Sequence, residues 1–143
     1  MEPVMTAADL TDFLVRDFAE VAADFAVEAV TEEGMTLRLL AHPRHLRPGG
    51  TVSGPAMFAL ADVAMYLAIL SRIGPVALTV TTNCSIDFLR KPAAGADLIA
   101  TARLLKLGRR LAVGDVLIRA GTAPEPVARA GLTYAIPPRD GVR

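Results

Sequence analysis

The chain has 143 residues, of which 52% are hydrophobic and 21% charged, and its 15 basic and 15 acidic residues give a formal net charge of zero. This length suits a single domain, 1–143, with a hydrophobic core, and the composition excludes a generally disordered chain. The neutral balance provides no basic field that would attract nucleic acid, so we expect no nucleic-acid partner.

Three features of the sequence bear on location, cysteine chemistry and metal binding. The first ten residues lack the basic start and apolar core of a signal peptide, so we expect a cytoplasmic protein. Cys84 is the single cysteine, which excludes an intramolecular disulfide and a cysteine-based zinc cluster. His42 and His45 form a His-x-x-His pair, but a proline-broken loop does not fix two imidazoles on one face. We therefore expect no metal site.

The first part of the chain predicts a helix followed by two strands. From residue 6 to about 21, apolar side chains recur at helical spacing behind Thr6, which suits a helix cap. Residues 24–42 indicate two strands joined at Glu33-Gly34. Residues 42–50 contain two prolines and two glycines, so we expect a loop there.

Residues 54 to about 72 predict one long helix that is apolar on every side. Ser53 or Gly54 would cap it, and Pro55 suits its first turn. A central Asp62 and a length near the short limit of membrane spans argue against a transmembrane segment, so we expect no membrane partner. A helix of this kind in a globular protein is a fully buried one.

From residue 76 the hydrophobic period changes from helical to two. Residues 76–88 alternate between mostly apolar even positions and polar odd positions, which predicts a long half-buried strand. Three more strands follow at short turns, so we expect a four-stranded antiparallel meander and then a polar tail at 137–143. The expected class is α+β: an antiparallel six-stranded sheet wraps the central helix, and a partner subunit covers the remaining helix flank.

Asp62 is the strongest functional signal in the sequence. Its neighbours one helical turn away are all apolar: Phe58, Ala59, Met65 and Tyr66. A buried aspartate can be a structural residue tied to backbone amides or to an arginine. Because an unpaired buried charge is very costly, such acids are often functional, and we favour a general base or nucleophile.

Gly54 begins the same helix and suggests a site for a developing oxyanion. A helix N-terminus presents free amides with positive dipole character, although a plain helix start is an equally good explanation. Pro55 has no N–H group, so the donor would be Gly54 or Ala56. We expect Cys84 to be a buried, inert thiol. Exposed turn cations usually serve solubility, but four could meet phosphates: Arg90, Lys91, Arg109 and Arg110.

With these residues identified, the chain resembles the hotdog-fold acyl-CoA thioesterases, in the branch that includes the phenylacetate-pathway (PaaI-like) enzymes. SGPAMFALAD, residues 53–62, stands where that family has His-Gly-Gly and a helical Leu-Ala-Asp. TVTTNCSIDFLRKPAAG, residues 79–95, resembles its long third strand and the turn that follows. LLKLGRRLAVGDVLI, residues 104–118, is similar to its Gly-Lys/Arg hairpin.

The resemblance implies a thioester hydrolase that needs no cofactor, because coenzyme A is part of the substrate. The family aspartate activates water or attacks the thioester carbon, a role that falls on Asp62. The first motif glycine polarises the carbonyl through its amide, which is Gly54 here, and Thr81 occupies the position of a water-orienting hydroxyl. The family's active sites are shared within a homodimer, with a tetramer as a dimer of dimers as the larger alternative. Further residues expected at the substrate are Arg47, Ser53, Met57, Phe58, Asn83, Arg109 and Arg110.

The sequence departs from this family pattern at three positions. Ser53 replaces the motif histidine, Pro55 replaces the second glycine, and Arg47 replaces a loop asparagine. Serine and proline suit a helix start, whereas Arg47 changes charge and size beside the thioester and suggests an acyl group with a negative or aromatic end. Two other functions stay open: a non-catalytic acyl-CoA-binding protein, which Asp62 argues against, and a hotdog hydratase or dehydratase. The latter would carry a helical glutamate much closer to the Pro-Gly loop.

Overall fold

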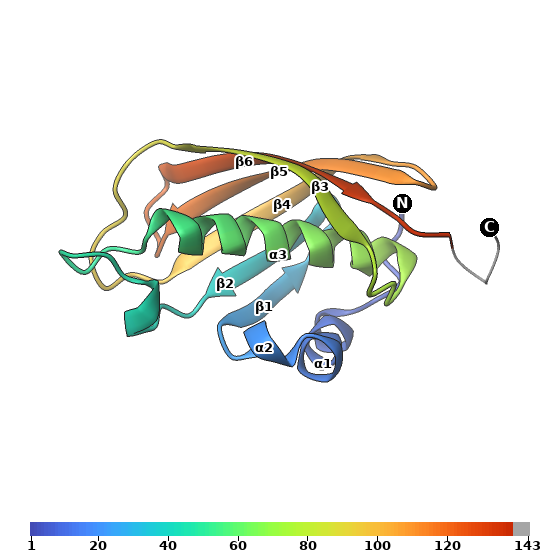
Figure 1. Ribbon diagram of the computed structural model, residues 1–143, viewed down its shortest axis with the longest axis horizontal. Helices are drawn as coiled ribbons and strands as arrows, with labels where there is room; N and C mark the ends of the chain where they lie inside the picture. Colours follow the sequence, from blue (N-terminus) through green and yellow to red (C-terminus); the bar gives the residue numbers. More distant parts are fainter. Residues whose placement is uncertain (139–143) are drawn as a thin grey trace.

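A computed structural model describes residues 1–138, in which a six-stranded antiparallel sheet curls around one long helix (Figure 1). The α+β hotdog fold predicted from the sequence is therefore confirmed, including an N-terminal helix. Residues 139–143 of the predicted polar tail lie outside the described residues. The elements are α1 (Ala7–Asp17), α2 (Ala19–Ala22), β1 (Phe25–Val30), β2 (Gly34–Leu39), the 3-10 turn η1 (Pro43–His45), α3 (Gly54–Ile73), β3 (Val80–Phe88), β4 (Leu98–Leu107), β5 (Leu111–Ala120) and β6 (Pro126–Ala135).

The N-terminal segment is broken into two helices, so the expected single helix from 6 to about 21 is wrong in its extent. Thr6 caps α1 through a capping box with Asp9, as a helix start requires. The break falls at Phe18, whose φ of −140° and ψ of 47° leave the helical region. This conformation brings the Phe18 ring edge-on to Tyr66 of α3, with 6.0 Å between the ring centroids.

The strand order in the sheet is β1-β2-β4-β5-β6-β3, so the predicted four-stranded meander is wrong. Only β4, β5 and β6 form a meander, and β3 lies at the opposite edge, beside β6. Residues 89–97 are not a tight turn but a connection that passes the amino-terminal end of α3 (Figure 1). The physical reason is burial: β4 carries fully buried side chains and occupies the sheet interior, whereas no residue of β3 is fully buried.

A β-bulge in β3 changes which side chains face α3. Thr81 pairs with Tyr134 and Asn83 pairs with Thr133, which leaves Thr82 as the extra residue. Cys84 is half-buried on the inner side, as the even-position pattern predicted. Before the bulge the alternation is reversed: Thr81 faces α3, whereas Val80 and Thr82 are exposed. The predicted parity is therefore wrong from residue 80 to residue 82.

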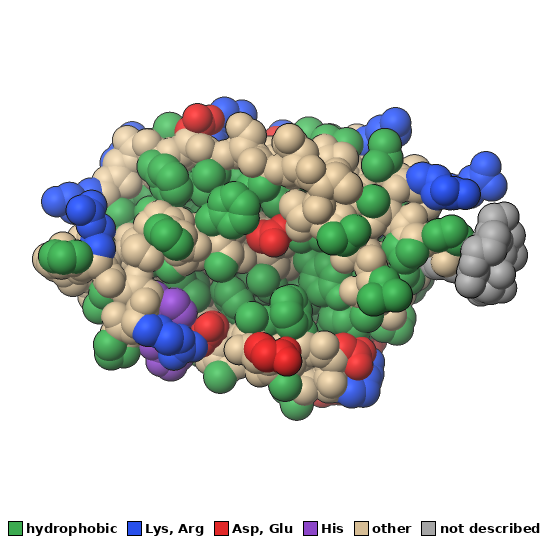
Figure 2. Space-filling model, viewed as in Figure 1, with side chains coloured by type: hydrophobic (Ala, Val, Ile, Leu, Met, Phe, Trp, Pro, Cys, Tyr) green, Lys and Arg blue, Asp and Glu red, His purple; other side chains and the backbone are tan. Residues whose placement is uncertain are grey.

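The central helix begins and ends close to the predicted residues. The Ser53 side chain caps α3 by accepting from the Ala56 amide, and Gly74 ends it with a φ of 93°. By length and composition α3 could cross a membrane, yet 78% of its most apolar window is buried inside the protein. One flank stays open near its start, where Phe58 is 40% exposed. Figure 2 shows hydrophobic side chains gathered on this face, between β3 and the N-terminal helices.

Candidate active site

The Asp62 carboxylate is held by two hydroxyl groups. Its Oδ1 accepts from Thr81 Oγ1 at 2.7 Å and from the Tyr134 hydroxyl at 2.6 Å. None of the ion pairs between residues 1–138 includes Asp62. Within these residues, Asp62 is therefore not a structural aspartate paired with an arginine. Two hydroxyl groups of the sheet therefore fix the position of Oδ1. The structure brings together two of the three predicted catalytic residues, Asp62 and Thr81.

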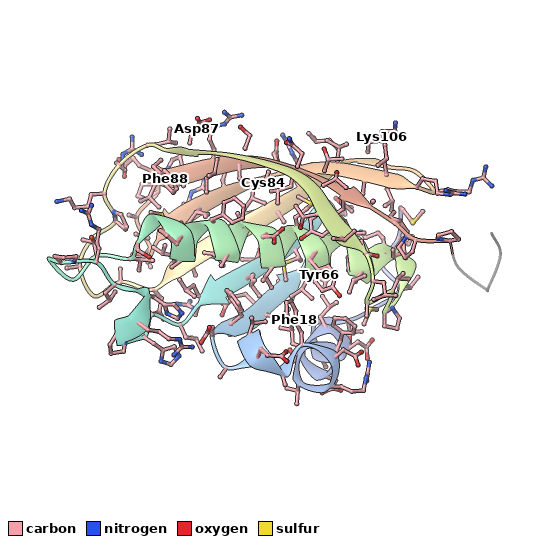
Figure 3. The ribbon with its side chains drawn as sticks, in the orientation of Figure 1. Phe18, Tyr66, Cys84, Asp87, Phe88 and Lys106 are labelled. Carbon is pink, nitrogen blue, oxygen red and sulfur yellow. The ribbon has the colours of Figure 1, made fainter. Side chains whose placement is uncertain are left out.

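A cavity of about 350 Å³ opens beside Asp62. Its wall is mostly apolar or aromatic, and the lining residues are Asp17, Phe18, Asp62, Val63, Tyr66, Ala77, Leu78, Thr79, Val80, Thr81 and Tyr134. Phe18 and Tyr66 meet edge to face on one side of it (Figure 3). Burial, with a smaller effect of Asp17, raises the pKa of Tyr66 to about 12. We refer to this space as the Asp62 cavity.

Of the large apolar side chains near Asp62 along α3, Tyr66 lines the Asp62 cavity, whereas Met57, Phe58 and Met65 do not. Met65 is 1% exposed and packs directly over Gly114, where an added Cβ would overlap the end of the Met65 side chain. Met57 lines a different cavity, and Phe58 lies on the open flank of α3.

Sequence analysis missed Asp17, Phe18 and Tyr134. Phe18 could have been noticed in the sequence, because the helical spacing of apolar residues in the first segment ends there. Tyr134 has no comparable signal, because an aromatic residue in an apolar strand usually belongs to the core.

Gly54 lies in a second cavity, of about 390 Å³, at the start of α3. Ser53 satisfies the next two available amides, since its Oγ accepts from Ala56 and its carbonyl from Met57. Pro55 has no amide hydrogen, and within residues 1–138 the Gly54 N–H has no acceptor. Of the two candidate donors, Ala56 is therefore already hydrogen-bonded, and Gly54 has the free amide within the described residues.

The Gly54 cavity is positively charged. Arg47, Arg90 and Lys91 all line it, and none of its lining residues is acidic. The connection between β3 and β4 brings Arg90 and Lys91 here, because it passes the start of α3 (Figure 1). Phe88 packs over Gly54, with its Cζ 3.3 Å from where a Cβ would stand (Figure 3). Any side chain at position 54 would therefore press on this ring.

The remaining predicted substrate residues are spread over the fold. Arg109 and Arg110 are exposed at the turn between β4 and β5, at the other end of the sheet from Gly54 (Figure 1). Asn83 is exposed, just after the bulge. These three residues line neither the Asp62 cavity nor the Gly54 cavity of one chain.

The His-x-x-His segment has a structural arrangement centred on Asp24. The His42 amide donates to His45 Nδ1 at 3.0 Å, and His45 Nε2 lies 3.5 Å from an Asp24 carboxylate oxygen. Arg44 pairs with the same carboxylate. These contacts fasten the loop before α3 to the start of β1.

The Asp62 and Gly54 cavities share no lining residue. Eight residues of helical rise separate Asp62 and Gly54 by about 12 Å, which is too far for both to contact one carbonyl group. Within one chain, the candidate base and the candidate oxyanion donor therefore belong to different cavities.

Comparison with known proteins connects this geometry to a family. A family model described as the thioesterase superfamily matches residues 49–127, which include Gly54, Asp62 and Thr81. The chain belongs to the thioesterase superfamily. The comparison with curated proteins found no match.

Solved structures of the superfamily share the fold of this chain. A protein from a Silicibacter species, provisionally described as a thioesterase, is 51% identical, with a TM-score of 0.90 over 96% of each chain. The phenylacetic acid degradation protein PaaI of Thermus thermophilus, solved as a mutant, is 26% identical, with a TM-score of 0.69 over 82% of this chain and 97% of its own. PaaI of Escherichia coli, from the phenylacetic acid degradation operon, is 24% identical, with a TM-score of 0.78 over 92% and 94%. The hotdog thioesterase family predicted from the sequence is confirmed, and two PaaI proteins are among the structures that share its fold.

Proposed function

We propose that the protein hydrolyses acyl-CoA thioesters to a carboxylic acid and free coenzyme A. The observation that carries this proposal is the Asp62 carboxylate, which lines a cavity while two hydroxyls hold its Oδ1. Within the described residues Oδ2 has no donor, so it is the oxygen available to take a proton from water or to attack the thioester carbon. Purified protein would be screened against straight-chain and aryl acyl-CoAs with free thiol as the readout. No thiol release from any of them would overturn the proposal.

The proposed active site combines two subunits of a homodimer. Asp62 of one chain would act on a thioester whose carbonyl oxygen accepts from the Gly54 amide of the other chain. The separation of the two cavities supports this arrangement, and so does the open edge of β3. That edge carries exposed apolar side chains, with Val80 56% and Phe88 53% exposed. Unpaired apolar edges of this kind are ready to pair with another chain.

The charges of the two cavities suggest which part of the substrate each accepts. The Asp62 cavity has two carboxylates, Asp17 and Asp62, and no basic lining residue. The Gly54 cavity has three cations and suits the phosphate-bearing coenzyme arm. We therefore propose that the acyl group is uncharged and that Arg47 faces the coenzyme rather than a negatively charged acyl end.

A terminal carboxylate on the acyl group is expected to reduce turnover. Adipoyl-CoA should show a kcat/KM on the order of 10-fold below that of hexanoyl-CoA, because its charge would lie among two carboxylates. Asp17→Asn should bring the kcat/KM values of the two substrates closer together. The control Asp12→Asn removes an exposed charge from the same helix and should leave their ratio unchanged. Equal use of both substrates by the parent protein would show that the acyl end lies elsewhere.

Removal of the Thr81 hydroxyl is expected to reduce kcat by about 10-fold, since one of two donors to the carboxylate is lost. Thr82→Val is the matched control: it deletes the same hydroxyl from the next residue, whose Oγ1 bonds to the Thr133 carbonyl at 3.2 Å. Steady-state kinetics of Thr81→Val and Thr82→Val would test whether the bulge places Thr81, and not Thr82, next to Asp62. A larger loss for Thr82→Val would mean that the strand register is shifted by one residue.

A further inference from the structure

Tyr134 places a buried hydroxyl against the proposed catalytic carboxylate. The residue lies on β6, is 2% exposed, and pairs directly with Thr81 across the strand boundary. Side chains of directly paired residues lie on the same face of a sheet, so Tyr134 and Thr81 approach Asp62 together. The Tyr134 ring also stacks on Tyr66, with 6.1 Å between centroids and 25° between planes, which fixes its position.

The Tyr134 hydroxyl has two acceptors and a single proton. It lies 2.6 Å from Asp62 Oδ1 and 2.7 Å from the main-chain carbonyl oxygen of Asp62. A charged acceptor forms the stronger hydrogen bond, so the proton points to Oδ1 while Asp62 is ionised. Once the carboxylate loses its charge, the hydroxyl can rotate and donate to the main-chain carbonyl, which has a second lone pair.

This alternative removes a cost that a buried hydroxyl would otherwise incur. A buried donor that loses its only partner costs the full desolvation penalty of the group. With a second acceptor within 2.7 Å, the Tyr134 hydroxyl stays hydrogen-bonded in both charge states of Asp62. Burial, followed by the Asp62 charge, raises the pKa of Tyr134, so the phenol keeps its proton and remains a donor.

We propose that Tyr134 is a positioning residue for Asp62: with Thr81 it holds Oδ1 so that Oδ2 faces the cavity, and its hydroxyl rotates to the Asp62 main-chain carbonyl when the carboxylate is neutralised. No proton leaves Tyr134 in this step, since only the direction of its O–H bond changes. Tyr134 forms part of the cavity wall, but at 2% exposure its hydroxyl is directed to Asp62, and its proposed effect on the reaction passes through that carboxylate. The inference rests on the proposed thioesterase reaction for its kinetic consequence, and its hydrogen-bond part stands independently of activity.

The kinetic test compares single and double hydroxyl deletions. Tyr134→Phe keeps the ring and should lower kcat by about 10-fold with KM within about two-fold, because a hydrogen bond to a charged group is lost. Thr81→Val together with Tyr134→Phe should lose more than the product of the single losses, since no donor then holds Oδ1. An unchanged kcat with reduced thermal stability would make Tyr134 purely structural. A raised KM at constant kcat would mean that it contacts substrate. Either result would overturn the proposal.

The spectroscopic test follows the Tyr134 hydroxyl proton by nuclear magnetic resonance in protein with labelled tyrosine. A far-downfield hydroxyl resonance is expected in the parent protein, lost in Tyr134→Phe. In Asp62→Ala, which removes both side-chain oxygens and keeps the main-chain carbonyl, it should persist but move upfield, because the charged acceptor is gone while a neutral one remains. A resonance that disappears or does not move in Asp62→Ala would overturn the two-acceptor arrangement. If the parent protein hydrolyses no thioester, the proposed function fails, and this resonance still decides whether the hydroxyl exchanges acceptors.

Discussion

Asp62→Asn is expected to fold, to form the same oligomer and to bind acyl-CoA, while its turnover falls by a factor on the order of 10²–10⁴. The amide side chain has nearly the shape of the carboxylate and can still accept from Thr81 through Oδ1, while the Tyr134 hydroxyl can turn to the main-chain carbonyl of residue 62. What it loses is the negative charge and the basic Oδ2. The loss should therefore appear in kcat, measured by thiol release, with little change in the affinity for substrate.

The matched control for this change is Asp115→Asn, which removes a carboxylate from the outer face of the sheet, where it pairs with Arg103 at 3.0 Å. That variant should keep its activity, because exposed ion pairs contribute little. Hydrolysis by Asp62→Asn within a few-fold of the parent would make Asp62 a structural residue. Unfolding of Asp62→Asn would support the same conclusion, since it would mean that the fold needs the charge.

Much of the fold could be predicted because the sequence patterns are local. The 3.6-residue and two-residue hydrophobic periods, with prolines and glycines at their borders, placed the central helix and the strands of the sheet. The bulge at Thr82 could not be predicted, because no glycine or proline marks it and it is set by pairing with β6. The edge position of β3 could not be predicted from the sequence either, because strand order depends on which strands bury side chains in three dimensions.

Some residues of the candidate site could likewise be predicted from the sequence, and others are visible only in the structure. Asp62 was visible because a carboxylate among apolar neighbours contradicts the local pattern, and Gly54 because it opens a helix. Tyr134 and Phe18 fit their local patterns, so only the packed structure shows that they surround Asp62. For Arg90 and Lys91 the sequence left a solvated turn and a phosphate contact both open. The path of residues 89–97 past the start of α3 brings these two cations to the Gly54 cavity.

The shared-site proposal predicts that two inactive variants restore each other. Asp62→Asn lacks the base, and Gly54→Pro lacks the amide hydrogen proposed to bind the carbonyl oxygen. In a mixed dimer, one site combines both defects and the other combines an intact Asp62 with an intact Gly54. Random pairing after unfolding, mixing and refolding makes about half of the dimers mixed, so activity should return to about a quarter of the parent value.

The control for position 54 is Gly54→Ala, which adds a Cβ at 3.3 Å from Phe88 Cζ but keeps the amide hydrogen. It should retain much more activity than Gly54→Pro, since Phe88 is 53% exposed and can shift. Size measurements would first establish that both inactive variants form dimers, and mixing differently tagged chains would establish that subunits exchange. If mixed dimers form and no activity returns, each site must be built from one chain. The separation of about 12 Å along α3 would then require Asp62 to act without the Gly54 amide.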